Sequence, residues 1–267
     1  MSLFQGISYQ RLPMVNPRPL MVHVIKIDLT APGINLFVTP GEPGEDGQEI
    51  AAQTTAEFLE GYQVQVAINA SFFYPIFLKT YWNYFPKTGD RVQVVGQAIS
   101  DGVIYSEPQK HWYVFCVADQ NVVKIYPERC PNLTVHAVSG NSLLLQGGQP
   151  VPIKNSEDGN QLFPRTAVGF DAAGKTLWFV IVDGRQQGYS EGMTLAELQN
   201  VFIDLRADTA LNLDGGGSTA LVIEHRRGSR TLNSPIHTRI PMRHRPIANH
   251  IGVYARPRPE SILLNFY

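Results

Sequence analysis

The sequence is poor in the features that mark several large classes of protein. It has only two cysteines among 267 residues, and their spacing does not match a zinc site. No apolar run reaches the ~18 residues that a membrane-spanning helix needs. Lys and Arg are scattered, the net charge is −1, and the one stretch rich in Arg and His is residues 225–245. We therefore expect no membrane span, no nucleic-acid partner and no cofactor, and the question of a metal stays open.

The N-terminal residues and the two cysteines leave the cellular location open. Residues 1–9 lack the basic start and apolar core of a signal peptide. If a leader has been removed from the chain, we expect a secreted or periplasmic protein. Cys116 and Cys130 lie at or near the ends of two expected strands, 112–117 and 122–126. A hairpin would bring them together as a disulfide, which is typical of oxidising compartments, and two unpaired buried thiols fit the sequence equally well.

What the chain does contain is enough apolar material for a sizeable core. Hydrophobic residues make up 43% and charged residues 17% of the chain, as in a folded domain. No low-complexity linker, repeat or break in composition divides it. We expect one strand-rich α/β (α+β) domain in which a mixed sheet is flanked by helices. Residues 1–60 would form an N-terminal strand and helix layer of this domain, and residues 61–257 its main part.

Hydrophobic patterning predicts the order of the elements. Alternating or continuous short apolar runs indicate strands, and a spacing of three to four residues indicates helices. The pattern predicts strands at 20–29, 34–38, 63–69 and 246–254, a helix at 48–60, and short strands between 91 and 153. Residues 71–90 break this periodicity and contain eight aromatic residues. These rings either form a wall for stacking sugars or pack in the core.

The most informative segment is the run Leu211-Asn212-Leu213-Asp214-Gly215-Gly216-Gly217-Ser218-Thr219. The apolar residues before Asp214 indicate a buried strand, so this carboxylate stands at a strand end. Each glycine costs roughly 0.5–1 kcal/mol relative to alanine, and a fold keeps three where the backbone approaches another group or where φ is positive. The run is not a P-loop, because Gly-x-x-x-x-Gly-Lys-Ser/Thr is absent. A tight turn without chemistry would explain the glycines, and the carboxylate favours a site.

A second carboxylate, Asp183, has the same setting. The apolar run 176–182 indicates a strand covered on both faces, and it ends in Asp183-Gly184-Arg185. A helix follows, marked by the capping-box pair Thr194 and Glu197. We expect a βαβ unit over about residues 176–214. Its two strands would be parallel, so both carboxylates would lie at the same sheet edge, where α/β folds bind ligands.

Six motifs in this order resemble the phosphodiester glycosidase family. They are Asn69-Ala70-Ser71-Phe72-Phe73, Arg165-Thr166-Ala167-Val168-Gly169, Val182-Asp183-Gly184-Arg185, Gly192-Met193-Thr194-Leu195-Ala196-Glu197-Leu198, the Leu211 to Thr219 run and Arg245-Pro246-Ile247-Ala248-Asn249. The resemblance covers roughly residues 60–255 and is strongest from 165 to 222. It implies a hydrolase that cleaves the bond between sugar and phosphate in a carbohydrate phosphodiester, such as one in an exopolysaccharide.

Two motifs depart from the pattern of that family. Ala70 and Ser71 stand where the family usually has two glycines, and Ser139-Gly140-Asn141-Ser142-Leu143 stands where it often has Gly-Gly-Pro. Both differences bear on the shape of the pocket, and so on the substrate more than on the fold. The change at Ala70 and Ser71 allows an alternative function, a non-catalytic carbohydrate- or cell-envelope-binding module on the same scaffold.

The chemistry of a sugar 1-phosphodiester determines what the site needs. Ordinary glycoside hydrolysis uses two carboxylates, one of which protonates the leaving group. A departing phosphate monoester has a second pKa of about 6, so it needs its charge neutralised more than it needs a proton. We therefore expect one essential carboxylate, Asp214 ahead of Asp183, with the other orienting sugar hydroxyls.

The remaining site residues are expected in the same motifs. Arg165, Arg185 and Arg245 suit bidentate contacts with phosphate oxygens, although each could also be solvated or held in a structural ion pair. Amides and hydroxyls of the glycine run suit the same anion, namely those of Gly215, Gly216, Gly217, Ser218 and Thr219. Asn69 and Asn249 suit sugar hydroxyls or an N-acetyl group. Three histidines are either general acids or structural residues: His237, His244 and His250.

Overall fold

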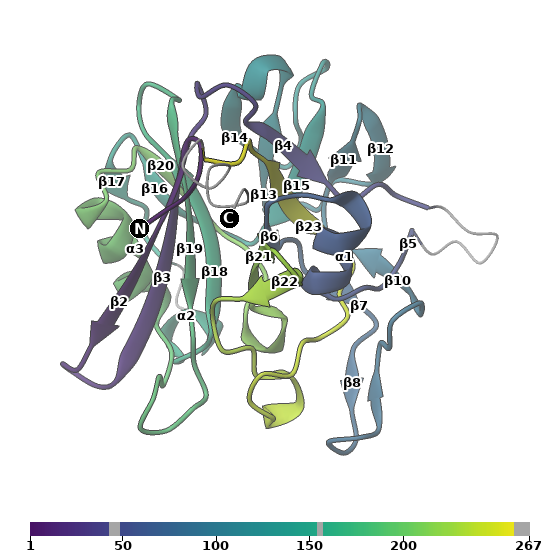
Figure 1. Cartoon of the computed structure of the whole chain (residues 1–267), viewed down its shortest axis with the longest axis vertical. Helices are drawn as coiled ribbons and strands as arrows, with labels where there is room; N and C mark the ends of the chain where they lie inside the picture. The colour runs from purple at the N-terminus through teal and green to yellow at the C-terminus, as the bar shows by residue number, and fades with distance from the viewer. Residues whose placement is uncertain (43–48, 154–156, 259–267) are drawn as a thin grey trace, which may run out of the picture.

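Antiparallel β-sheets packed around shared cores make up most of the fold (Figure 1). The computed structural model describes residues 1–42, 49–153 and 157–258, the side chains of 157 and 158 excepted. The largest sheet has eight strands, in the spatial order β1 (Ser2–Phe4), β2 (Ile7–Met14), β3 (Leu20–Asp28), β19 (Thr176–Val182), β18 (Arg165–Phe170), β20 (Thr209–Asn212), β16 (Ser142–Gln146) and β17 (Gln149–Pro150).

Two five-stranded sheets and two small ones contain the other strands of the described residues. The second sheet has the order β22 (Gly228–Thr231), β21 (Leu221–His225), β6 (Val66–Asn69), β23 (His250–Tyr254) and β4 (Asn35–Val38). The third has the order β12 (Val103–Ser106), β11 (Ala98–Ser100), β15 (His136–Gly140), β13 (Tyr113–Val117) and β14 (Val123–Pro127). The small ones are β5 (Ile50–Ala51), β10 (Arg91–Val94) and β7 (Phe73–Tyr74), and the pair β8 (Phe77–Leu78) and β9 (Tyr84–Phe85).

The chain is strand-rich and α+β, as predicted, but the single mixed sheet that was predicted is not present. The strands divide into several sheets, and each strand pairing within the described ranges is antiparallel. The strand at the C-terminal end also begins later than predicted, at His250 instead of residue 246. Patterning reports which residues are apolar, whereas sheet membership depends on partners distant in sequence.

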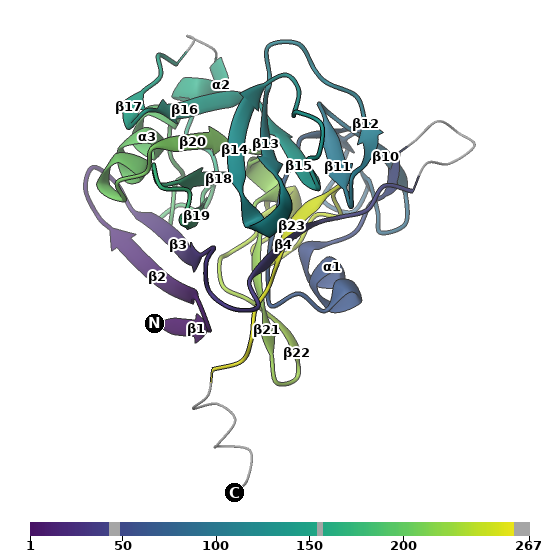
Figure 2. The ribbon, with the colours of Figure 1, turned by 90° about the horizontal axis from the view of Figure 1, so that it is seen from above.

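Strand β19 is covered on both faces, as its continuous apolar run predicts. Alternate side chains face a core shared with the second and third sheets: Leu177, Phe179 and Ile181. The others face a core that includes residues of helix α3 (Leu195–Asp204): Trp178, Val180 and Val182. In Figure 2 the sheet that contains β19 lies between α3 and the strands of the third sheet. A strand without a solvent face needs apolar residues throughout, which explains the absence of alternation.

Helix α3 connects β19 to β20 and has the predicted capping box. The side chain of Thr194 accepts the Glu197 N–H (3.2 Å), and the Glu197 carboxylate accepts the Thr194 N–H (2.9 Å). Strand β18 pairs antiparallel with both β19 and β20, so these two strands are parallel with β18 between them. The strand–helix–strand unit is therefore present with one strand inserted. Both parallel strands end at the edge where β18 begins with Arg165.

Helix α1 (Thr55–Tyr62) begins later than the prediction of 48–60. Residues 50 and 51 instead pair with β10 as strand β5, and residue 48 lies outside the described ranges. Thr54 and Glu57 form a capping box at the start of the helix. The residue after its end, Gln63, has a left-handed conformation (φ 56°). The helix packs on the second sheet through Phe58 and Leu59.

Residues 1–60 contribute strands to both of the sheets that hold the candidate site. Strand β3 pairs with β19 from Asp28↔Thr176 to Val22↔Val182, and β4 pairs with β23. The third sheet carries a disulfide between Cys116 in β13 and Cys130 beyond β14. Of the two alternatives that the sequence leaves open for the cysteines, the bonded one is present.

Candidate active site

The candidate active site lies where the largest sheet meets the second sheet. After β20, the N–H of Leu213 donates to the carbonyl oxygen of Thr166 in β18 (2.9 Å). The next N–H, that of Asp214, donates to the carbonyl oxygen of Ala70, one residue beyond β6 (2.9 Å). The chain thus crosses from one sheet to the other at Asp214. This crossing holds the Asp214 carboxylate at the junction of the two sheets.

A cavity of about 270 Å³ opens beside this crossing. Its walls come from six separate segments of the chain, and the residues that line it are Phe72, Asn141, Phe163, Arg165, Arg185, Leu213, Asp214, Gly215, Gly216, Gly217 and Arg245. Among these residues, Asp214 is the one carboxylate, and it lies with three arginines. The cavity therefore combines a single acid with an excess of positive charge, which suits an anionic ligand.

The three glycines are needed because other groups lie directly against the backbone. A Cβ atom on Gly215 would lie 2.5 Å from a backbone carbonyl oxygen. On Gly217 it would lie 2.5 Å from a guanidinium nitrogen of Arg245. Gly216 has φ +60°, and a Cβ atom there would lie 3.1 Å from a guanidinium nitrogen of Arg185. The close approach expected from the glycine run is thus made by two of the chain's own cations.

Arg245 is held by hydrogen bonds to both sides of its guanidinium group. Its Nη1 donates to the hydroxyl oxygen of Ser218 (3.1 Å), and its Nε donates to Nδ1 of His237 (3.1 Å). His237 is buried, and burial together with the charges of Arg245 and Arg243 lowers the pKa of His237 to about 3. The imidazole is therefore neutral at pH 7, with Nδ1 as the hydrogen-bond acceptor.

Arg185 extends from the turn after β19 to residues 215–219, which we call the glycine loop. Its backbone has φ 60°, and its guanidinium carbon lies 4.8 Å from the ring centre of Phe163. Burial lowers the pKa of both Arg185 and Arg245, and for Arg185 the charge of Arg245 lowers it further. Two cations that are partly removed from water and repel one another are stabilised when an anion binds between them.

The carboxyl group of Asp214 is buried and has one unoccupied oxygen. Burial raises the pKa of Asp214 to about 6, while the charge of Arg245 and hydrogen bonds from Ser218 and the Gly215 backbone oppose the rise. Atom Oδ2 of Asp214 is buried without a hydrogen-bond partner. At pH 7 most Asp214 carboxyl groups are ionised, so a negative charge stands in the wall of the cavity.

Asp183 lies at the same sheet edge, but its carboxylate does not line the cavity. Its Oδ2 accepts the hydroxyl of Tyr189 (2.9 Å) and lies 3.0 Å from Nε2 of His23. Its Oδ1 accepts the side-chain N–H of Asn233 (3.1 Å) and the backbone N–H of Ser234 (2.8 Å). Both oxygens are occupied by protein groups, and Asp183 is completely buried. It joins β3, the turn after β19 and the segment after β22.

Asn69, the last residue of β6, connects the glycine loop to the second sheet through hydrogen bonds. Its Nδ2 donates to the carbonyl oxygen of Asp214 (2.6 Å). Its Oδ1 accepts the hydroxyl of Thr166 (2.7 Å) and the backbone N–H of Ala220 (3.1 Å). One buried amide therefore contacts both ends of the loop. Asn69 does not line the cavity, so its contacts hold the loop in place.

Asn249 belongs to a buried network with the unusual Ser71. Its Oδ1 accepts the N–H of Ser71 (2.9 Å), and its Nδ2 donates to the Ser71 hydroxyl (3.3 Å) and to the hydroxyl of Tyr105 (3.1 Å). The Ser71 hydroxyl also accepts the N–H of Ser139 in β15 (3.0 Å). The departures from the family pattern at Ser71 and Ser139 therefore contact each other, outside the residues that line the cavity.

Two further predicted residues differ in how they relate to the cavity. Arg165 lines it and also holds its wall, because its Nε donates to the carbonyl oxygen of Met193 (2.9 Å) and its Nη2 to that of Gln161 (2.9 Å). Thr219 is buried, does not line the cavity, and has a hydroxyl without a hydrogen-bond partner. Ser218 reaches the cavity through its bond to Arg245.

Four residues that line the cavity were not among the predicted site residues. The ring of Phe163 lies against two guanidinium groups. Its centre is 5.3 Å from the guanidinium carbon of Arg165 and 4.8 Å from the guanidinium carbon of Arg185. Asn141 accepts a hydrogen bond from the Asn212 side chain through Oδ1 (2.8 Å). Phe72 and Leu213 are the other two. The aromatic segment and the motif 139–143 pointed to Phe72 and Asn141, whereas Phe163 had no signal beyond its place before Pro164.

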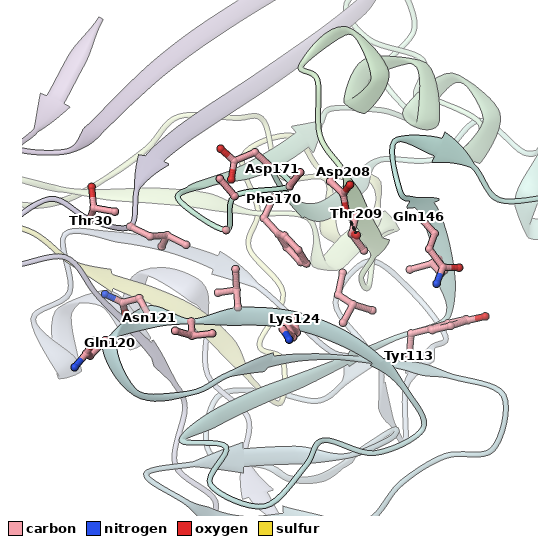
Figure 3. Close-up of a pocket in the computed structure, with 18 of the residues that line it drawn as sticks. Thr30, Tyr113, Gln120, Asn121, Lys124, Gln146, Phe170, Asp171, Asp208 and Thr209 are labelled. Atoms are coloured by element: carbon pink, nitrogen blue, oxygen red, sulfur yellow. Dashed lines mark hydrogen bonds between the residues drawn. The ribbon is translucent and has the colours of Figure 1, made fainter.

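A larger cavity, of about 570 Å³, lies at the opposite edge of the largest sheet (Figure 3). Phe170, at the far end of β18 from Arg165, forms part of its wall, and Lys124 of the third sheet lies on the other side. Its carboxylates serve local turns: Asp171 accepts the backbone N–H of Lys175 (2.8 Å), and Asp208 accepts the hydroxyl of Thr209 (2.8 Å). The charged groups do not converge, so the smaller cavity is the candidate active site.

The small cavity, with one carboxylate and three arginines, lies at the junction of two antiparallel sheets. Residues 62–254 match the phosphodiester glycosidase family, and the chain belongs to that family. It is also similar to the SPbeta prophage-derived uncharacterized protein YomE of Bacillus subtilis (strain 168), with 30% identity over 145 residues, 49% of this chain. The matched part is only 22% of YomE.

Two solved structures share the fold. A hypothetical protein from Synechocystis has a TM-score of 0.58 at 18% identity, with 94% of this chain and 62% of that one covered. The catalytic domain of zebrafish N-acetylglucosamine-1-phosphodiester alpha-N-acetylglucosaminidase, auto-inhibited by its pro-peptide, has a TM-score of 0.61 at 19% identity, with 96% and 85% covered. At these identities the likeness concerns the fold.

Two other kinds of site are absent from the described ranges. None of the helices there is both long and apolar enough to cross a membrane. No group of three His, Cys, Asp or Glu side chains in the same ranges is placed to hold a metal ion.

Proposed function

We propose that this protein hydrolyses carbohydrate phosphodiesters at the bond between the anomeric carbon of a sugar and the phosphate oxygen. The observation that carries the proposal is the make-up of the cavity, in which one carboxylate, Asp214, lies with three arginines. One acid and several cations suit a leaving group that is already an anion. Membership of the phosphodiester glycosidase family supports the same class of reaction.

The glycine loop and two arginines would bind the phosphate. Arg185 and Arg245 lie against Gly216 and Gly217, so a phosphate at this loop would contact both guanidinium groups. In the reaction the bond from the anomeric carbon to the phosphate oxygen breaks, and the phosphate monoester leaves with the bonding electrons. The two cations stabilise the negative charge that this oxygen gains, and they are in place before the reaction begins.

Asp214 would act on the sugar side of the same bond. Its ionised carboxylate stabilises the positive charge that develops at the anomeric carbon. It also receives a proton from the water molecule whose oxygen forms the new bond to that carbon. Asp183, with both oxygens occupied, would support the site by holding the segments around it.

An assay with matched substrates tests this function. Methyl diesters of hexose and N-acetylhexosamine 1-phosphates are compared with methyl glycosides of the same sugars. We expect turnover of a phosphodiester and none of the glycosides. Asp214→Asn should lower kcat/KM by ~10²–10⁴-fold, as for loss of a general acid–base group. Asp204→Asn, at the exposed end of α3, is the matched control and should leave kcat/KM unchanged.

The alternative is a non-catalytic carbohydrate- or cell-envelope-binding module. The residues that suggested it, Ala70 and Ser71, do not line the cavity, and of the second departing motif, 139–143, only Asn141 does. Binding of the phosphodiesters without turnover by the wild-type protein would contradict the proposed reaction and favour the module. Preferential turnover of the methyl glycosides would indicate an ordinary glycosidase.

A further inference from the structure

An exposed hairpin rich in aromatic residues projects from the body of the molecule at β8 and β9 (Figure 1). We refer to residues 74–87 as the aromatic arm. Large apolar side chains are exposed along it, by between 42% and 73%: Tyr74, Ile76, Phe77, Leu78, Tyr81 and Trp82. A concentration of exposed apolar side chains in one segment is typical of a binding surface.

The aromatic arm is connected to the cavity by direct contacts. Arg245 lines the cavity and donates a hydrogen bond to His237. The ring of Tyr84 lies edge-on to the His237 ring, with the ring centroids 4.5 Å apart. Arg243 donates a hydrogen bond to the carbonyl oxygen of Tyr81 (2.7 Å). The segment that forms the Arg245 side of the cavity therefore also supports the arm. A ligand that extends past Arg245 would reach the arm.

Cations lie over the rings of the arm. The charged groups are 3.0–5.7 Å from the ring centroids, in three pairs: Lys79 over Phe77, Lys87 over Tyr84 and Arg243 over Trp82. Residues 74–87 contain two lysines and no acidic residue. Ring faces provide a surface for the apolar faces of sugars, and the cations provide partners for phosphate groups. The combination suits a phosphate-bearing glycan.

On the basis of the proposed function, we propose that the aromatic arm binds the glycan attached to the phosphate, so that the substrate is a phosphate-bearing oligosaccharide or polymer. The phosphate to be cleaved lies at Arg245, and the glycan continues past His237 and Tyr84. Its sugar rings stack on Tyr81 and Trp82, whose side chains are 55% and 73% exposed. Joining two contacts in one ligand raises its affinity above that of either contact alone.

Two substrates of different length test this proposal. The short one is the methyl diester of the sugar 1-phosphate that the wild-type protein hydrolyses. The long one carries the same sugar 1-phosphate on the 6-hydroxyl of maltotetraose. In the double variant Tyr81→Ala/Trp82→Ala, the ratio of kcat/KM for the long over the short substrate should fall about tenfold. The control Leu133→Ala, at a side chain that is 91% exposed on the loop between β14 and β15, should leave this ratio unchanged.

A binding measurement separates the arm from the reaction. Maltotetraose 6-phosphate is titrated against the wild-type protein and Trp82→Phe, and the tryptophan fluorescence is recorded. We expect the glycan to change the fluorescence of the wild-type protein but not that of Trp82→Phe. Because the phenylalanine ring can still stack on a sugar, this variant should retain glycan binding in a competition assay. If the proposed reaction fails but the arm is correct, neither substrate turns over and this fluorescence change remains.

Other outcomes would overturn the proposed role of the arm. Turnover of both substrates with an unchanged ratio and no fluorescence response would do so. Sedimentation with vesicles of anionic phospholipid that depends on Trp82, without a response to the glycan, would assign the arm to a membrane surface. A mass that doubles with protein concentration, and returns to that of one chain in the double variant, would assign it to a second copy.

Discussion

At the scale of single residues, Asp183 and Asp214 each lie just beyond the end of a strand but make different contacts. Both follow an apolar strand and lie at the same sheet edge, as the sequence predicts. The N–H of Asp183 continues the pairing with β3 by donating to Met21 (3.0 Å), whereas that of Asp214 donates to the second sheet. The groups that contact them, His23 and Asn69, are 160 and 145 residues away. Local patterning contains no information on such partners.

The raised pKa of Asp214 predicts a loss of activity in acid. Because the reaction needs the ionised carboxylate, kcat/KM should rise with pH through the Asp214 pKa of about 6 and then level off. A pH–rate profile on the phosphodiester substrate measures this. Asp214→Asn should have low activity and no inflection at this pH. An inflection retained in that variant would assign it to another group.

The same pKa predicts how Asp214 affects stability. Its folded-state pKa, about 6, lies above the ordinary value of 3.8, so the folded protein binds the proton more tightly. This contribution is fully present below the ordinary pKa and is lost as the pH rises through the folded-state value. The free energy of unfolding of Asp214→Asn relative to wild type should therefore rise between about pH 4 and pH 8, by on the order of 2–3 kcal/mol. Urea denaturation at both pH values measures it, and a constant difference would contradict the prediction.

At the scale of elements, the two main helices differ in how far the sequence predicts them. The capping box and the spacing of apolar residues in α3 are local, and the predicted start at Thr194 is correct. The start of α1 was predicted too early, because residues 50–51 pair with β10 across the chain. Backbone pairing with a strand more distant in sequence takes precedence there over helix propensity.

The glycine loop is an element whose conformation can be tested by one added methyl group. In Gly217→Ala the new Cβ would lie 2.5 Å from a guanidinium nitrogen of Arg245, so that group must move. We expect kcat/KM to fall by about 10²-fold, the size of effect produced by a misplacement of ~1 Å in a catalytic site. Steady-state kinetics measures the fall, and circular dichroism checks that the fold is kept.

The matched control for this substitution is Gly61→Ala in helix α1. A Cβ atom on Gly61 meets nothing within 4 Å. Replacing glycine by alanine in a helix should stabilise the protein by about 0.5–1 kcal/mol and leave kcat/KM unchanged. Equal effects of the two substitutions on activity would show that the glycine loop does not require close contact with Arg245.

At the scale of the whole molecule, the site depends on contacts among three sheets. Asp214 joins the largest sheet to the second, and the contact from Ser71 to Ser139 joins the second to the third. The sequence predicts most strands and their order, since each is a short apolar run. It does not predict that they form several antiparallel sheets, because strand partners such as β6 and β23 are far apart along the chain.

The disulfide stabilises the third sheet and lies outside the residues that line the cavity. Cys116 and Cys130 are separated by 14 residues, and closing a loop of ~15 residues reduces the entropy of the unfolded chain by about 3 kcal/mol at 25 °C. Replacing both by serine should lower the free energy of unfolding by a similar amount and leave kcat/KM at 25 °C unchanged. Urea denaturation with and without a reductant measures it. Wild-type stability that a reductant does not change would contradict the prediction.

The role of Asp183 can be separated from that of Asp214 by comparing the two asparagine variants. Asp183→Asn replaces a carboxylate that accepts hydrogen bonds from three segments, and an amide group cannot accept at both positions. Each buried donor left without a partner costs about 1–3 kcal/mol, so this variant should be less stable than wild type at neutral pH. Asp214→Asn should not be destabilised there, since it removes a buried charge.

Activity measurements complete that comparison. Asp183→Asn should lose part of its kcat/KM because the turn that carries Arg185 and Tyr189 is less well held, and it should keep the inflection near pH 6 that belongs to Asp214. Thermal denaturation and pH–rate profiles of both variants provide the data. If Asp183→Asn instead lost the inflection and as much activity as Asp214→Asn, without a loss of stability, Asp183 would have to take part in the chemical step.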